Sequence, residues 1–267
     1  MCVCGALGRM GRTVTRVAAA SGVLKVVGAV ERPGHPELGR DAGLAAGLEE
    51  LGVAVTDDFA AAVREAGAYI DFAAPESVVE RLEQARALGA GSRPAAVIGS
   101  TGLTAQDQAR LAEAARDLPV LWSPNMSLGV NLMFKIAALM AAGLGPQFDA
   151  EIVEIHHRLK KDAPSGTALK LQQTVAHAKG LDPAGALVSG RSGLVGARAD
   201  EEIGVLAVRA GDVVGDHTLI FAGPGERLEL THRAHSRDTF AAGAVRAAAW
   251  LIGRPPGLYS LGDVLGL

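Results

Sequence analysis

The sequence contains little cysteine, and this shortage excludes several kinds of protein. Cys2 and Cys4 are its only cysteines. They lie two residues apart in an expected strand, so their side chains share a face but lack the usual reach for a disulfide. Neither a CxxC pair nor a metal-spaced cluster is present, so we expect no disulfide framework and no metal site. A reducing, cytoplasmic location fits this usage best.

Long apolar runs and basic clusters are missing as well. The longest apolar stretch, residues 130–144, contains Asn131 and Lys135 and is too short to span a bilayer. Glycine and arginine in residues 5–12 interrupt the start of the chain, so we expect no signal peptide. With a net charge of −3 and no basic run, neither a membrane nor a nucleic acid is an expected partner.

The composition that remains is that of a globular protein. Aromatic residues make up only 4% of the chain, whereas 49% of the residues are hydrophobic and 21% are charged, which argues against disorder. A length of 267 residues allows one large domain or two modest ones, each with a proper core. The many alanines and glycines suit small-residue packing in an α/β protein.

The first half of the chain alternates short apolar runs with helix-like stretches. The expected strands are residues 1–4, 26–30, 53–55, 68–72, 97–99 and 120–122. The expected helices include residues 76–88 and 105–116, and Thr104 is the expected N-cap of the latter. Strands and helices that alternate in this way predict a Rossmann-like, doubly wound parallel sheet.

The pattern changes after about residue 125. We expect a long apolar helix over 128–143, a strand over 151–156 and a helix over 168–179. A glycine-rich stretch, 185–196, shows little structure. Strands over 202–209, 218–222 and 227–233 then follow without helices between them, which favours antiparallel pairing, and Leu228 and Leu230 alternate with polar residues on the last strand. These elements predict a second, α+β domain with an open mixed sheet whose apolar face needs a partner.

The final expected helix, 239–252, returns most simply to the first domain. The expected domains are therefore residues 1–126 with 237–267, which would bind a dinucleotide, and residues 127–236.

A glycine-rich loop opens the first domain. Gly5, Gly8 and Gly11 lie between a short strand and a helix, whose N-terminal N–H groups suit a pyrophosphate. Alone, this spacing fits tight strand–helix packing equally well. Glu31 ends the next strand, where an acid binds the hydroxyls of the adenosine ribose. Arg32 beside it fits either a 2′-phosphate or a solvated charge.

Two polar turns follow later strands of the parallel series. Residues 99–102 and 123–126 both lie at the carboxyl ends of strands, the edge at which doubly wound folds bind ligands. Because glycine, serine, proline and asparagine are common turn residues, ordinary turns remain the alternative.

The densest polar segment runs from Glu154 to Thr167, with two imidazoles and three cations. His156 and His157 are neighbours at a strand end, so their side chains point to opposite sides. Pro164 favours a helix start, where hydroxyl and N–H donors of the following residues form a seat for a carboxylate. A structural histidine within a solvated charge run is the alternative reading.

At these residues a family resemblance becomes clear. The segment is similar to the substrate motif E-x-H-H-x-x-K-x-D-A-P-S-G-T of the 4-hydroxy-tetrahydrodipicolinate reductases, also called dihydrodipicolinate reductases, of lysine and diaminopimelate biosynthesis. The similarity extends over essentially the whole chain. It includes residues 5–12, 71–76, 99–102, 124–131, 209–217, 225–232 and 236–240.

The resemblance implies a role for each matching residue. The pyrophosphate would be wrapped by Gly5, Ala6, Leu7, Gly8, Arg9 and Met10. Glu31 would hold the ribose, and Arg32 would allow NADPH as well as NADH. The nicotinamide end would be lined by Gly99, Ser100, Thr101, Ser123, Pro124, Asn125 and Met126. His156 would donate or accept a proton and Lys160 would be a second donor. A substrate carboxylate would be held by His157, Ser165, Gly166 and Thr167.

The implied reaction is the NADH- or NADPH-dependent reduction of 4-hydroxy-tetrahydrodipicolinate, a small dicarboxylate, to tetrahydrodipicolinate with loss of water. Binding of the dicarboxylate would close the two domains, and the protein would be a homotetramer. Three positions depart from the family pattern: Leu159 stands at a frequent histidine, Ser100 at a common threonine and Met126 at a common aromatic residue. A different dinucleotide-dependent dehydrogenase and a non-catalytic dinucleotide sensor are the rival interpretations, because a fold alone excludes neither.

Overall fold

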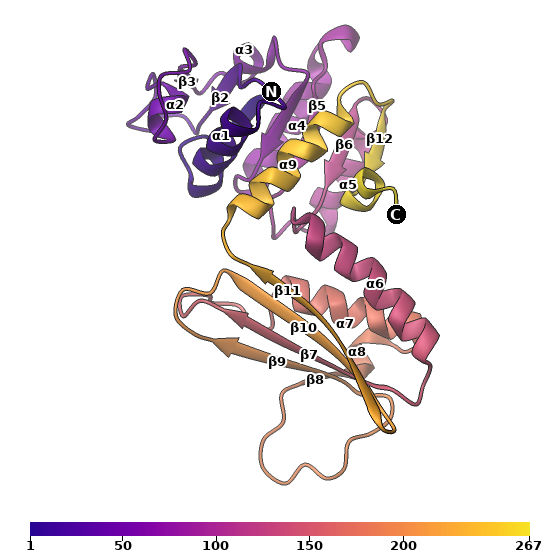
Figure 1. The fold of residues 1–267 in the computed structure, drawn as a ribbon. Helices are drawn as coiled ribbons and strands as arrows, with labels where there is room; N and C mark the ends of the chain where they lie inside the picture. The colour runs from indigo at the N-terminus through magenta and orange to yellow at the C-terminus, as the bar shows by residue number, and fades with distance from the viewer. The chain divides into compact units, whose positions relative to one another are not determined.

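The computed structural model describes residues 1–267, the side chain of Ala90 excepted. The chain divides into two compact units. One combines Met1–Leu128 with Arg237–Leu267, and the other is Gly129–Ser236 (Figure 1). The predicted classes of both units, a doubly wound parallel sheet and an α+β arrangement with a mixed sheet, are confirmed.

The first unit is built on a seven-stranded sheet with the order β12-β6-β5-β4-β1-β2-β3. All neighbouring strands are parallel. The strands are β1 (Cys2–Cys4), β2 (Gly28–Val30), β3 (Val55–Thr56), β4 (Ala68–Asp71), β5 (Ala95–Ile98), β6 (Pro119–Trp122) and β12 (Gly257–Tyr259). Strand order reverses between β1 and β4, and the crevice beyond such a reversal is the usual ligand site of this architecture.

Helices cover both faces of this sheet, which explains why its central strands are apolar throughout. One face packs against α1 (Arg9–Ser21), α2 (Ala42–Ala45), α9 (Asp238–Leu251) and α10 (Leu261–Leu265). The other packs against α3 (Phe59–Val63), α4 (Pro75–Ala87) and α5 (Ala105–Ala114), with a 3-10 turn at Ala90–Ser92. Figure 1 shows α1 and α9 side by side.

Two local predictions are confirmed in this unit. The Thr104 hydroxyl accepts a hydrogen bond from the Asp107 N–H, and the Asp107 carboxylate accepts one from the Thr104 N–H, a complete capping box. Cys2 and Cys4 are buried, unpaired thiols on the α3–α5 face of the sheet.

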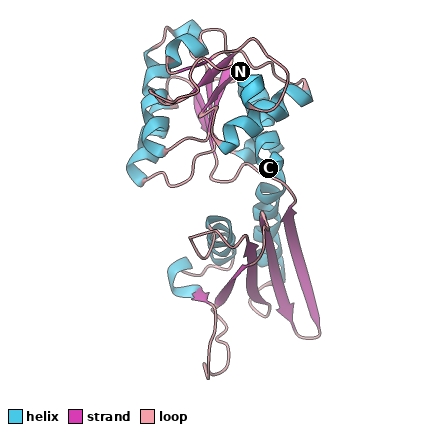
Figure 2. Ribbon diagram, turned by 90° about the vertical axis from the view of Figure 1, so that its left-hand side faces the viewer, coloured by secondary structure: helices cyan, strands magenta, loops and turns pink.

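The second unit contains a five-stranded mixed sheet with the order β11-β10-β7-β9-β8. Its strands are β7 (Asp149–His156), β8 (Leu187–Ser189), β9 (Ile203–Arg209), β10 (Gly215–Gly223) and β11 (Glu226–Ala234). One face packs against α6 (Leu128–Leu144), α7 (Gly166–Ala178) and α8 (Pro183–Ala186). Figure 2 shows these strands and the long hairpin of β10 and β11.

The expectation of antiparallel pairing among the last three strands needs correction for β9. It pairs parallel with β7, and β10 pairs antiparallel with β7 on the other side. β7 takes this central position because residues on both of its faces are apolar, such as Ile152 and Val153. The stretch expected to show little structure, 185–196, contains the end of α8 and all of β8, which pairs parallel with β9.

The leucine face of β11 also differs from expectation. Leu230 packs against the core beneath the unit's own helices, whereas Leu228 is 44% exposed. The helix-side face of the sheet is therefore largely covered within the unit, whereas the opposite face leaves Leu206 51% exposed.

Candidate functional site

The loop between β1 and α1 has the geometry of a diphosphate cradle. Gly5 has a φ of +66°, a left-handed conformation that favours glycine. A Cβ added to Gly11 would lie 2.1 Å from the carbonyl oxygen of Gly5, so the helix approaches the loop more closely than any side chain permits. Gly8, the N-cap of α1, supplies no side-chain cap, which leaves the first turn suited to an anion.

The carboxylate of Glu31 reaches this loop from the end of β2. Its Oε2 accepts a hydrogen bond from the Leu7 N–H at 3.1 Å, and its Oε1 accepts one from the Arg32 N–H at 3.0 Å. Ala6 and Leu7 are buried, whereas Arg9 and Arg32 are exposed at the surface. The acid expected at the ribose thus lies beside the glycine loop, as a dinucleotide site requires.

A cavity of about 540 Å³ continues from this loop within the first unit. Many of its lining residues belong to the nicotinamide end expected from sequence: Gly99, Ser100, Thr101, Pro124, Asn125 and Met126. Met10, expected at the pyrophosphate, lines it as well. Ser123 is buried behind them, and its hydroxyl donates to the Asn125 carbonyl at 2.7 Å. This volume lies within the range of small-molecule pockets.

Sequence reasoning assigned no role to the other lining residues, which include Phe72, Arg237 and Phe240. Phe72 lies against Gly99, where an added Cβ would come within 2.2 Å of the ring. Asp71 fixes the start of the loop between β4 and α4. Its buried carboxylate pairs with Arg81 at 2.7 Å and accepts a hydrogen bond from the Ala73 N–H at 2.8 Å. The family motif that includes Asp71 and Phe72 pointed to this segment, but the sequence did not show that it lines the cavity.

The dense polar segment centres on a buried carboxylate, that of Glu154. Its Oε2 lies 2.6 Å from Nδ1 of His156, and its Oε1 accepts from the Ser165 N–H at 3.0 Å. Arg209, at the end of β9, donates to both oxygens at 2.8 and 2.9 Å. Glu154 and His156 are buried on the same face of β7, while His157 follows the strand and is half-buried.

A second histidine, His217 on β10, lies beside the first. The two rings are 5.2 Å apart between centroids, nearly perpendicular. Nε2 of His217 lies 3.0 Å from the Ser165 hydroxyl, which also accepts from the Ala168 N–H as the N-cap of α7. A Cβ on Gly215 would lie 3.0 Å from Nε2 of His156, so glycine there makes room for the imidazole.

These contacts change the place of Ser165 in the expected carboxylate seat. Its N–H and hydroxyl are both engaged within the protein. They shape the turn at the N-terminus of α7, where Gly166 is exposed. Among the residues the structure describes, Nδ1 of His157 is buried without a hydrogen-bond partner, as is Nδ1 of His217.

Lys160, the second expected proton donor, is held by a residue that sequence reasoning missed. Its Nζ donates to both carboxylate oxygens of Asp162 at 2.9 and 2.8 Å. This ion pair is the main reason that the pKa of Asp162 lies below its ordinary value. Arg158, Lys161 and Leu159 are exposed.

Burial governs the protonation of this cluster. It lowers the pKa of His156, and the contact with Glu154 opposes the shift. Burial would raise the pKa of Glu154, but hydrogen bonds from Arg209 and His156 keep it below its ordinary value. Burial lowers the pKa of His217 to about 3 from 6.5. Its neutral form therefore stabilises the fold fully above pH 6.5, and that stabilisation is lost as the pH falls towards 3.

Glu154, Arg209 and His217 received no role from the sequence because their contacts link distant positions. Arg209 lies 55 residues from Glu154, and His217 lies 52 residues from Ser165. A charged residue between apolar neighbours on β7 was the only local sign of the network.

The described side chains contain no cluster of three or more His, Cys, Asp or Glu residues that could hold a metal ion. Among the described residues, no helix has the length and apolarity needed to cross a membrane.

Comparison with known proteins identifies the family. Models of the dihydrodipicolinate reductase N-terminus and C-terminus match residues 1–126 and 129–265. The 4-hydroxy-tetrahydrodipicolinate reductase of Anaeromyxobacter dehalogenans strain 2CP-1 is 53% identical over 265 residues, which cover 99% of this chain and 97% of that protein. The protein of the same name from Citrifermentans bemidjiense is 51% identical over 266 residues, covering 99% and 98%.

A solved structure shares the fold. Dipicolinate-bound dihydrodipicolinate reductase from Paenisporosarcina sp. TG-14 superimposes with a TM-score of 0.75 at 24% identity, covering 97% of this chain and 96% of that one. The two family models together, and each relative by itself, extend over nearly the full chain. The chain therefore belongs to the dihydrodipicolinate reductase family.

Proposed function

We propose that this protein reduces 4-hydroxy-tetrahydrodipicolinate to tetrahydrodipicolinate with loss of water, using NADH or NADPH, in the biosynthesis of lysine and diaminopimelate. The observation that carries the proposal is the pairing of His156 with buried Glu154 beside the turn that begins α7. A proton donor and a carboxylate seat held by one network suit the reduction of a small dicarboxylate.

The first unit fits a dinucleotide. The close approach of Gly11 to Gly5 and the uncapped start of α1 leave room and donors for a diphosphate, with Glu31 beside them for the ribose. We assign dinucleotide binding to residues 1–126 with 237–267. When bound, the reduced nicotinamide supplies the hydride. Pro124 to Met126 and Gly99 to Thr101 shape the cavity that orients the ring.

The second unit, residues 127–236, would bind the substrate. His157 and the N–H groups of Gly166 and Thr167 would hold one carboxylate at the positive end of α7. Lys160 would exchange its contact with Asp162 for a substrate carboxylate or deliver a proton. His156 would transfer a proton to the ring through Nε2, because Nδ1 faces Glu154.

One assay tests the reaction itself. Oxidation of NADH or NADPH is followed by absorbance while the substrate is made in situ from pyruvate and aspartate semialdehyde by the preceding synthase. We expect oxidation that depends on the substrate. Cofactor binding without such oxidation would instead favour the dinucleotide sensor.

Arg32 should control the use of NADPH. Because its guanidinium is exposed beside Glu31, we expect Arg32→Ala to raise the KM for NADPH by about tenfold, the effect of losing roughly 1.4 kcal/mol of phosphate binding, while the KM for NADH changes little. Steady-state kinetics with each cofactor measure this change. Arg64→Ala, which removes an exposed charge elsewhere in the same unit, is the control. Equal changes for both cofactors would show that Arg32 does not contact the 2′-phosphate.

The sheet of the second unit supports a homotetramer. On the face away from its helices, Val153, Leu206 and Thr218 form one row across neighbouring strands, and Leu206 is 51% exposed. Exposed apolar side chains on an uncovered sheet face suit a symmetric contact between copies of the chain. The buried thiols of Cys2 and Cys4 in the first unit suit a reducing, cytoplasmic location.

Charge placed on this face should break the assembly. We expect Leu206→Asp to yield smaller species than the wild-type tetramer in light scattering, since an unpaired charge would be buried between subunits. Leu139→Asp alters a more exposed leucine on α6, at 63% against 51%, and should leave the mass unchanged. Dissociation by the α6 variant alone would place the interface elsewhere.

A further inference from the structure

The contacts of Glu154 add one residue to the proposed proton-transfer site around His156. Its carboxylate lies on β7, is fully buried, and makes four contacts with three residues. Arg209 donates to each oxygen, the Ser165 N–H donates to Oε1, and Nδ1 of His156 lies at Oε2. Because an ionised carboxylate only accepts, the hydrogen between Glu154 and His156 must belong to Nδ1. Nε2 is then the nitrogen available for proton transfer.

Resting on the proposed role of His156, we propose that Glu154 is a positioning residue that fixes the Nδ1–H form of His156 and ties that imidazole to the substrate-binding turn at Ser165. Arg209 completes the arrangement, because a buried carboxylate without a counter-charge would lose its ionised form. Arg209 also donates to the Asp162 carbonyl at 2.7 Å, so the same guanidinium anchors the loop that carries Lys160.

The charges around His156 give a direction to the pH dependence. Glu154 faces it from β7, Lys160 from the following loop, Arg209 from β9 and His217 from β10. Burial lowers the pKa of His156 most, Glu154 raises it, and Lys160 and Arg209 lower it. Without the carboxylate, the pKa of His156 should fall further. As the pH rises, the activity that needs protonated His156 should then be lost at a lower pH in a variant without the Glu154 carboxylate than in the wild type.

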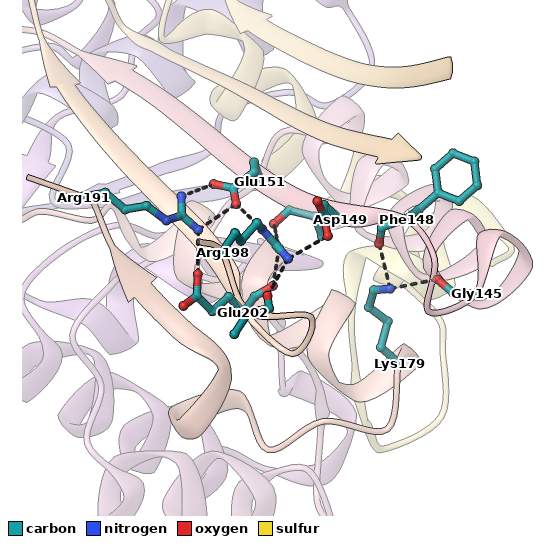
Figure 3. Close-up of polar contacts among 10 residues, drawn as sticks. Gly145, Phe148, Asp149, Glu151, Lys179, Arg191, Arg198 and Glu202 are labelled. Atoms are coloured by element: carbon teal, nitrogen blue, oxygen red, sulfur yellow. Dashed lines mark hydrogen bonds and ion pairs between the residues drawn. The ribbon is translucent and has the colours of Figure 1, made fainter. Parts of the chain in front are cut away.

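A second glutamate of β7, Glu151, supplies a matched control. Glu151 lies on the same strand, on the opposite face, and its carboxylate is bound by two arginines, where that of Glu154 is bound by one (Figure 3). Arg191 and Arg198 reach it from the loop between β8 and β9, and Gly204 on β9, opposite Glu151, leaves room for the carboxylate. Glu151→Gln therefore removes a similar arginine-bound charge without touching His156.

The experiment compares Glu154→Gln with Glu151→Gln. In histidine-selective ¹⁵N NMR of the full chain without substrate, we expect the wild type and the Glu151 variant to show His156 protonated at Nδ1. In the Glu154 variant the Nε2–H form should appear. His156→Gln assigns the signal. An unchanged tautomer in Glu154→Gln would overturn the inference, and because no turnover is needed, this result is independent of whether the chain reduces the proposed substrate.

Kinetics supply the second readout. We expect Glu154→Gln to lower kcat at least about tenfold, as loss of an orienting carboxylate does elsewhere. In a His156→Gln background it should add little, because it acts through that ring. If the losses of kcat from Glu154→Gln and His156→Gln multiply in the double variant, the positioning role is contradicted. If Glu154→Gln does not fold, Glu154→Asp keeps the charge and shortens its reach, and it should show the same shift of tautomer in part.

Discussion

Replacing His156 with glutamine is expected to lower kcat by about 10²–10⁴-fold, the usual contribution of a positioned acid or base. Glutamine keeps a polar side chain of similar length but carries no transferable proton near neutral pH. Lys160→Ala should cause a loss of the same order, because alanine removes the second proton donor. The measurement is kcat at saturating substrate with the better nicotinamide cofactor.

The pH dependence of kcat/KM should separate the two proton donors. Because burial lowers the pKa of His156, the limb that reports its protonated form in the free enzyme should lie at lower pH than for an exposed histidine. That limb should vanish in His156→Gln and persist in Lys160→Ala. His177→Gln, at an exposed position of α7, is the control and should change neither kcat nor the profile. Near wild-type kcat in both site variants would remove His156 and Lys160 from the mechanism.

Alanine at Gly11 should disable the dinucleotide loop. The added Cβ would lie 2.1 Å from the Gly5 oxygen and 2.7 Å from the Ala6 Cα, and both are backbone atoms that cannot rotate away. The loop must therefore shift. We expect kcat/KM for NAD(P)H to fall by about 10²-fold, as a displacement of about 1 Å can cause, and the free energy of unfolding to fall by about 1–3 kcal/mol from overpacking.

The same substitution at Gly143 is a matched control. Gly143 also lies in a helix, α6, but a Cβ there meets no atom within 4 Å. Alanine should stabilise that helix by up to about 1 kcal/mol, because glycine is the poorer helix former. Thermal unfolding and cofactor titration of both variants measure the difference. Full cofactor binding by Gly11→Ala would show that the loop tolerates a side chain.

The parts of the fold that sequence predicted are those set by local patterns. Glycine spacing located the loop before α1, and Thr104 identified the start of α5 because a capping box lies within four residues. Alternation of strands and helices gave the parallel sheet. The order of strands in the second unit was beyond such patterns, since the place of β7 between β9 and β10 depends on pairings between distant segments.

The same limit applies to the functional sites. His156 and Lys160 belong to one short motif, but Arg209 and His217 join them only when β9 and β10 pair beside β7. Likewise Phe240, near the start of α9, meets the cavity lining of Gly99 and Met126 through packing of the folded unit. Site residues that lie together in one segment of the sequence could be predicted. Those that meet only after distant strands pair or helices pack could not.

The return of α9 to the first unit sets an order of events during synthesis. Ala244, Ala248 and Leu251 belong to the core that also contains Val3 and Val14. The ribosome makes Gly129–Ser236 in full before any of α9 exists. On the ribosome, therefore, the inserted unit can fold while its host still exposes the apolar surface that α9 will cover. Until α9 has emerged, the nascent protein carries a finished second unit and an unfinished first one.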